Sequence, residues 1–160
     1  MIPAVAPTHD GWRPENPKLS AEDLTVGETI ELGDQFVSRA DIVDFASQWD
    51  PLPFHTDPSA ARLTVFGDII GSGVHLMAIY QRLAVLSAYQ NWTIVAGRSI
   101  RDAQFMSPLR PDTTVRATVT IESVTSHSAE DASVSLLGRV LHHDIVLMSV
   151  HVDAYVLRRT

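Results

Sequence analysis

Apolar and polar residues alternate through the second half of the chain, which is the pattern of β-strands that bury one face. The alternation is longest in two stretches, 115–122 and 146–156, and two further strand segments accompany them at 101–106 and 134–141. Turns are expected near Asp131 and at His143-Asp144, because polar residues interrupt the pattern there. This half is therefore predicted to form a meander of long antiparallel strands.

Helical spacing precedes these strands. Apolar residues recur at intervals of three and four between Ile42 and Trp49, and Ser38 stands three residues before Asp41 in a near-match to a capping box. We expect a helix over 39–49 that ends before Pro51. A short strand pair or hairpin is expected before it, over 27–37, with its turn at Gly33-Asp34.

Two further helices are predicted. Asp57-Pro58 is an N-cap followed by a proline at the first helical position, so a short helix begins there. From Val74 to Tyr89 apolar residues fill more than one helical face, which is typical of a buried helix. Helices followed by a run of strands indicate an α+β fold, and the economical packing is a curved antiparallel sheet wrapped around the buried helix.

The first 20 residues differ from the rest of the chain. They carry prolines at positions 3, 7, 14 and 17, with no hydrophobic period and no pattern of a signal peptide. We interpret 1–20 as a proline-rich arm and 21–160 as a single domain.

Composition narrows the classes of function. With 160 residues, of which 45% are hydrophobic, the domain can build its own core. The absence of cysteine excludes thiolate catalysis, disulfides and cysteine metal sites. A net charge of −7 argues against binding to nucleic acid or anionic membranes, and no apolar run reaches the roughly 20 residues that span a bilayer. A cytoplasmic protein is expected.

Candidate chemistry lies in the loop that follows the helix at 39–49. It places Asp50, His55 and Asp57 within eight positions, and prolines restrict its conformations. A fully extended loop would separate Asp50 from His55 by roughly 15 Å, so a shared role requires the loop to turn back on itself. Asp57 is interpreted as an N-cap, and Asp50 has an alternative role as an acceptor of turn hydrogen bonds.

The histidines of the chain offer no metal site. His55 and Asp57 lack a third ligand at a suitable spacing. His142 and His143 are expected on opposite faces of a strand, and His75 is expected to be a hydrogen-bonded structural residue.

Gly71-Ser72-Gly73 precedes the buried helix. Glycines there would let a ligand approach the free N–H groups of the helix N-terminus, where a phosphate or an enolate-like oxygen can bind. The alternative interpretation is a tight turn between loop and helix.

Together these segments resemble a known family. The motif W-D-P-x-P-F-H-T-D-P-x-A-A at 49–61, followed by F-G-x-x-x-x-S-G-x-H at 66–75 and F-M-S-P-L-R-P at 105–111, is similar to the MaoC-like dehydratases, or (R)-specific enoyl-CoA hydratases. The resemblance implies a hot-dog fold and a homodimer or higher homo-oligomer with active sites near the subunit interface. It also implies a role in fatty acid metabolism.

The resemblance also implies a reaction. Asp50 and His55 match the catalytic pair that holds a water, adds it to C3 of a trans-2-enoyl-CoA and returns a proton to C2. Ser72 and Gly73 match the helix entrance, where the Gly73 N–H is expected to bind the thioester oxygen. The acyl-CoA thioester is the substrate, and no cofactor is expected. Leu52 stands where the family commonly has asparagine.

Two alternatives remain open: a hot-dog acyl-CoA thioesterase and a non-catalytic hot-dog partner subunit. Two sets of residues are also candidates for binding the substrate. Arginines for the phosphates of the carrier are Arg98, Arg101, Arg110, Arg158 and Arg159. Side chains expected to set the size of the acyl pocket are Tyr80, Leu83, Leu86 and Trp92.

Overall fold

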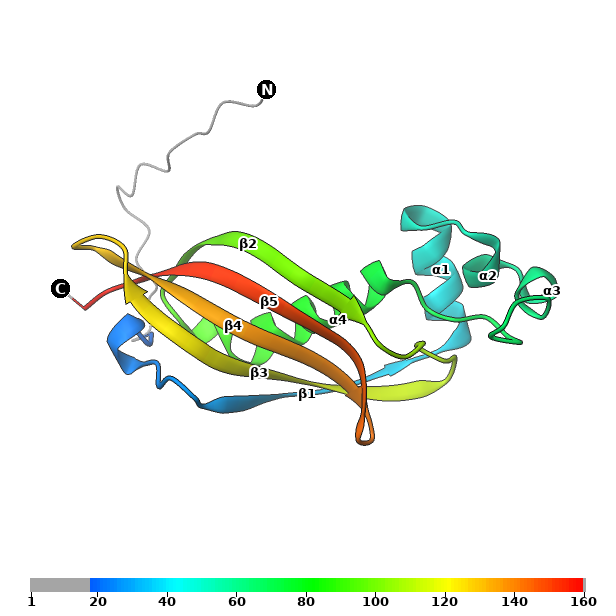
Figure 1. Cartoon of the computed structure of the whole chain (residues 1–160), viewed down its shortest axis with the longest axis horizontal. Coiled ribbons are helices and arrows are strands. Elements are labelled where there is room, and N and C mark those ends of the chain that lie inside the picture. The colour runs from blue at the N-terminus through cyan, green and yellow to red at the C-terminus, as the bar shows by residue number, and fades with distance from the viewer. Residues whose placement is uncertain (1–17, 160) are drawn as a thin grey trace, which may run out of the picture.

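One curved antiparallel sheet wraps around the long helix α4 (Gly73–Ser87) in a computed structural model that describes residues 18–159 (Figure 1). The strand order is β1-β3-β4-β5-β2. The expected α+β class and hot-dog arrangement are confirmed. The strands are β1 (Thr29–Val37), β2 (Ile94–Phe105), β3 (Thr113–Ser126), β4 (Asp131–His142) and β5 (Ile145–Leu157). The other helices are η1 (Ala21–Asp23), α1 (Arg39–Trp49), α2 (Pro53–Thr56), α3 (Pro58–Ala61) and η2 (Tyr89–Asn91).

The core lies between α4 and the concave face of the sheet. Alternate residues of β3 and β4, such as Val119 and Leu136, are fully buried against the helix, as the period-two pattern predicts. Tyr80 of α4 is 1% exposed, and its hydroxyl is 2.8 Å from the hydroxyl of Tyr89. Burial raises the pKa of Tyr89 to about 12. The Tyr80 ring lies directly over Gly138 of β4, where no side chain would fit.

The predicted hairpin over 27–37 is wrong. One strand, β1, pairs with β3 along its whole length, and the register shifts between Glu31 and Gly33. Gly33 has a φ of 93°, so its backbone forms a bulge inside the strand and not a turn between two strands. Gly33 does adopt the unusual backbone conformation that the glycine-aspartate pair indicates. Because β1 pairs continuously with β3, that conformation produces a bulge and does not reverse the chain.

Helices α1, α2 and α3 lie together beyond one end of the sheet (Figure 1). Ser38 and Asp41 form a complete capping box at the start of α1, which confirms that helix and its boundaries. The Asp57 carboxylate accepts hydrogen bonds from the N–H groups of Ser59 and Ala60, as expected for an N-cap. The single turn α2 was not predicted, because four residues are too few for a periodic pattern.

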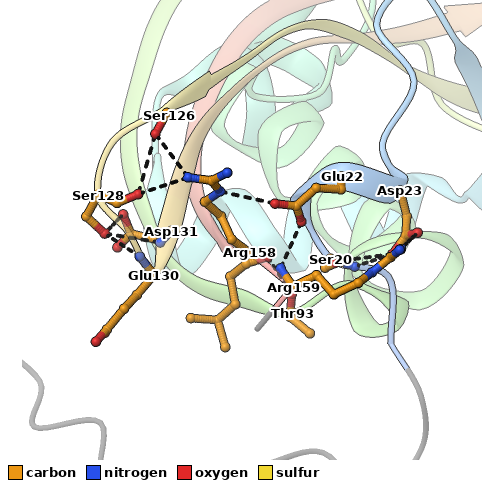
Figure 2. A network of polar contacts seen from close by, with 11 residues as sticks. Ser20, Glu22, Asp23, Thr93, Ser126, Ser128, Glu130, Asp131, Arg158 and Arg159 are labelled. Carbon is orange, nitrogen blue, oxygen red and sulfur yellow. Dashed lines mark hydrogen bonds and ion pairs between the residues drawn. The ribbon is translucent and has the colours of Figure 1, made fainter.

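The C-terminal end of β5 is fastened at the opposite end of the sheet. Figure 2 shows Arg158 bound to Glu22, and Arg159 bound to both Glu22 and Asp23. The Arg159 N–H holds the pKa of the Glu22 carboxyl group below its usual value. The pKa of Asp23 is lowered chiefly by hydrogen bonds from the N–H and hydroxyl of Ser20, and further by Arg159. Positions 1–17 of the predicted arm lie outside the described residues, and Leu19 already pairs with Trp92 of the domain.

Candidate active site

The loop after α1 turns back on itself and brings Asp50 and His55 together. The Leu52 N–H donates to the Asp50 carbonyl at 2.8 Å, and the His55 N–H donates to the Leu52 carbonyl at 2.9 Å. The turn α2 follows directly, with Pro53 at its first position, where no N–H is needed. As a result His55 Nε2 lies 3.5 Å from Asp50 Oδ2, and not at the roughly 15 Å of an extended loop.

His55 is held in one orientation by the main chain. Its Nδ1 lies 2.6 Å from the Ile70 carbonyl oxygen, and the residue is only 5% exposed. A carbonyl oxygen can only accept, so Nδ1 carries the proton. In the neutral ring Nε2 therefore bears the lone pair, and it is this nitrogen that faces Asp50.

Ser72 orients the carboxylate. Its hydroxyl donates to Asp50 Oδ2 at 2.6 Å and accepts from the Val74 N–H at 3.1 Å, so it also caps α4. Ser72 is fully buried and does not line the cavity described below. The hydroxyl thus uses both its donor and an acceptor position in contacts within the protein. This favours a role for Ser72 in positioning Asp50 and not the predicted contact with substrate.

The two glycines that flank Ser72 have side chains of a distant segment packed onto them. A Cβ on Gly71 would lie 2.6 Å from Leu109 Cδ2, and a Cβ on Gly73 would lie 2.7 Å from Phe105 Cζ. Neither glycine has a positive φ, so the turn itself does not require them. The Gly73 N–H makes no hydrogen bond with residues 18–159 and remains available at the N-terminus of α4.

A cavity of about 380 Å³ joins these groups. Asp50 and His55 form part of the lining, and so does the segment Phe105–Leu109, which begins at the last residue of β2. The remainder is apolar, with Gly73 and the first turns of α4 at one side. The additional lining residues are Phe66, Ile70, Gly71, Val74 and Leu76. An acid–base pair in a largely apolar cavity is suited to proton transfer on a small organic substrate.

The residues expected to shape the acyl pocket do not line this cavity. Tyr80, Leu83 and Trp92 belong to the core, and Leu86 is 49% exposed. They lie farther along α4 or after it. Because an α-helix rises about 1.5 Å per residue, even Tyr80 is roughly 10 Å along the helix from Gly73. Sequence reasoning missed the roles of Phe105 and Ile70, because the end of β2 and the loop before α4 reach the site only through the tertiary fold.

The candidate arginines are mostly engaged elsewhere. Arg158 and Arg159 follow β5 and bind Glu22 and Asp23 (Figure 2), none of which lines the cavity. Arg101 makes a bidentate pair with Asp153 at 2.7 and 2.8 Å. Arg98 stacks over the Tyr155 ring. Arg110 alone among the five contacts the cavity wall, by donating to the Phe66 carbonyl at 2.7 Å.

The other histidine predictions are corrected. His142 and His143 do not lie on opposite faces: a left-handed turn at His143, with φ of 51°, brings their ring centroids to 4.2 Å. His75 stacks on Phe45, but its buried Nδ1 has no hydrogen-bond partner within 18–159, and burial lowers the pKa of its ring. Over the same residues, no three His, Asp or Glu side chains are arranged to hold a metal ion. No helix among them is sufficiently long and apolar to cross a membrane.

Comparisons with known proteins identify a family. A family model described as MaoC like domain matches residues 21–141. An uncharacterised protein of Bacillus subtilis strain 168 is 30% identical over 94 residues, which cover 59% of this chain and 67% of that protein.

Solved structures show the same fold. A MaoC-like dehydratase from Rhodospirillum rubrum is 31% identical with a TM-score of 0.80, and the match covers 89% of this chain and 99% of that one. An (R)-hydratase from Pseudomonas aeruginosa is 16% identical with a TM-score of 0.72, covering 89% and 88%.

Proposed function

The chain belongs to the MaoC-like domain family, and from this membership we propose that it interconverts a trans-2-enoyl-CoA and a 3-hydroxyacyl-CoA. The family match and the likeness to a dehydratase support a hydratase or dehydratase. The observation that carries the finer proposal is the pairing of His55 Nε2 with Asp50 Oδ2 at 3.5 Å in a cavity of about 380 Å³.

The two side chains divide the proton transfers. A water in the cavity donates one hydrogen bond to the lone pair on His55 Nε2 and a second to the ionised Asp50, which only accepts. As the water oxygen bonds to C3, His55 takes its proton and the C2–C3 double-bond electrons move toward the thioester oxygen. His55 then returns a proton to C2, so the elements of water are added across the double bond. Dehydration is the same path in reverse.

The N-terminus of α4 stabilises the charge that develops. The Gly73 N–H has no hydrogen-bond partner in the part of the chain that the structure describes, and the helix dipole favours negative charge there. A donor aligned with an enolate-like oxygen contributes about 3 kcal/mol to the transition state. The proposed reaction uses water and side chains and no cofactor. Arg110, which lies against the cavity wall, is suited to bind a phosphate of the carrier.

A second copy of the chain is part of the proposal. The edge strand β2 is largely exposed, and Ile100 on it is 63% exposed. Beside it a hollow of about 700 Å³ is lined mainly by apolar residues of α4, β2 and β5, including Val85 and Val152. An unpaired edge next to an apolar hollow favours association, and a homodimer is expected. Size-exclusion chromatography with light scattering measures the molar mass and tests this. The variant Ile100→Lys should shift the measured mass toward that of a monomer.

Hydration of crotonyl-CoA tests the reaction. Loss of the enoyl-thioester absorbance without release of free thiol supports hydration, whereas thiol release supports the alternative thioesterase. Asp50→Asn and His55→Gln should each lower the rate by about 10²-fold or more while the protein stays folded. Full activity in both variants would refute the acid–base roles, and a wild-type protein inactive on short and long enoyl-CoA substrates would favour a non-catalytic partner subunit.

A further inference from the structure

Gly71 and Gly73, on either side of Ser72, are each covered by an apolar side chain, but the two covering side chains differ in burial. Leu109, which packs on Gly71, is completely buried, and the Gly71 N–H donates to its carbonyl at 2.8 Å. Phe105, which packs on Gly73, is 54% exposed and lines the cavity. Leu109 belongs to the hydrophobic core, whereas the Phe105 ring is exposed at the cavity.

The backbone beneath Phe105 is fixed. Phe105 ends β2 and pairs with Met148, and the next residue, Met106, donates its N–H to the Leu147 carbonyl at 2.8 Å. The strand is irregular just before this point, where Asp102 has a φ of 50° and the register with β5 shifts. The ring therefore projects from an anchored strand end onto the first residue of α4.

We propose that Phe105 is a specificity-determining residue that selects acyl groups unbranched at C2. This inference rests on the proposed function, in which the thioester oxygen binds the Gly73 N–H. C2 is bonded to the thioester carbon, so with the oxygen on this N–H it lies close to the ring that covers Gly73. The three ring atoms closest to a Cβ on Gly73 would lie 2.7 to 2.8 Å from it, so the ring already touches the main chain and cannot move closer.

A methyl group at C2 would compete with the ring for the same space. A linear enoyl chain needs less width there and passes beside the ring toward Asp50 and His55. One additional carbon in a tight pocket changes kcat/KM by about 10-fold to 200-fold, so the preference for the unbranched substrate is expected to be at least tenfold.

The experiment compares crotonyl-CoA with 2-methylcrotonyl-CoA for the wild type, Phe105→Ala and Phe105→Leu. Phe36→Ala is the matched control, because Phe36 is also 54% exposed and does not line this cavity. Phe105→Ala should raise the relative kcat/KM for the branched substrate by about tenfold or more. Phe105→Leu should shift it in the same direction by less, and Phe36→Ala should leave it unchanged.

The experiment distinguishes failure of the Phe105 role from failure of the proposed function. If the wild type hydrates crotonyl-CoA and the ratio stays unchanged in both Phe105 variants, the role of Phe105 is refuted while the hydratase assignment stands. If the wild type hydrates no enoyl-CoA of any chain length, the proposed function fails and the inference fails with it. Should Phe105→Ala not fold, an unchanged ratio in Phe105→Leu is sufficient to reject the role.

Discussion

Ser72→Ala separates the positioning of the Asp50 carboxylate from the capping of helix α4. The substitution removes the hydroxyl that donates to Asp50 Oδ2 at 2.6 Å and accepts from the Val74 N–H. A hydrogen bond to a charged group contributes about 1.5–3 kcal/mol. If that contribution is needed to hold Asp50 in its reactive orientation, kcat for hydration should fall by about 10-fold to 100-fold. The lost cap should also lower the free energy of unfolding by about 1 kcal/mol.

Ser38→Ala is the matched control for this variant. Ser38 caps α1 in the same manner, with its hydroxyl accepting from the Asp41 N–H at 3.1 Å, and it does not touch Asp50. Urea denaturation should show a similar loss of stability in both variants, while stopped-flow hydration assays should show a reduced kcat only for Ser72→Ala. Equal kcat values in the two variants would refute the positioning role of Ser72.

Three further predictions concern packing and charge. Gly73→Ala should reduce hydration of crotonyl-CoA by tenfold or more, since its Cβ would lie 2.7 Å from Phe105 Cζ, and Gly73→Ala combined with Phe105→Ala should recover part of that loss if the clash is the cause. Gly138→Ala should lower the free energy of unfolding by about 1–3 kcal/mol, because its Cβ would overlap the fully buried Tyr80 ring, and an unchanged urea midpoint would contradict this packing. Arg101 holds the pKa of Asp153 below its usual value, so this pair stabilises the fold at neutral pH and loses its effect as the pH falls below about 4. Asp153→Asn should therefore be less stable than wild type at pH 7, and the two urea midpoints should draw closer as the pH falls below about 4; a difference that does not change with pH would exclude the pair as its source.

Local pattern determined most of the regular structure. The alternation at 115–122 and 146–156 reports which residues face the core, and the capping pair Ser38 and Asp41 specifies the start of α1. Such signals depend on neighbours within one turn or one strand, so they can be read without the fold. The hairpin predicted at Gly33-Asp34 failed because a glycine of positive φ serves a bulge or a turn equally well, and only pairing with β3 distinguishes them.

The candidate site likewise has a part that the sequence predicts and a part that only the structure shows. Asp50 and His55 come from one short loop, and the sequence by itself determined that they were the candidate acid–base pair, with the resemblance supplying their roles. Only the tertiary structure decided that Ile70 fixes the tautomer of His55, that Ser72 holds Asp50, and that Phe105 covers Gly73. These contacts join residues 15, 22 and 32 positions apart along the chain, and no local spacing encodes them. The physical reason is that they exist only after the loop at 50–55, the segment 70–73 that leads into α4 and the end of β2 come together in the tertiary fold.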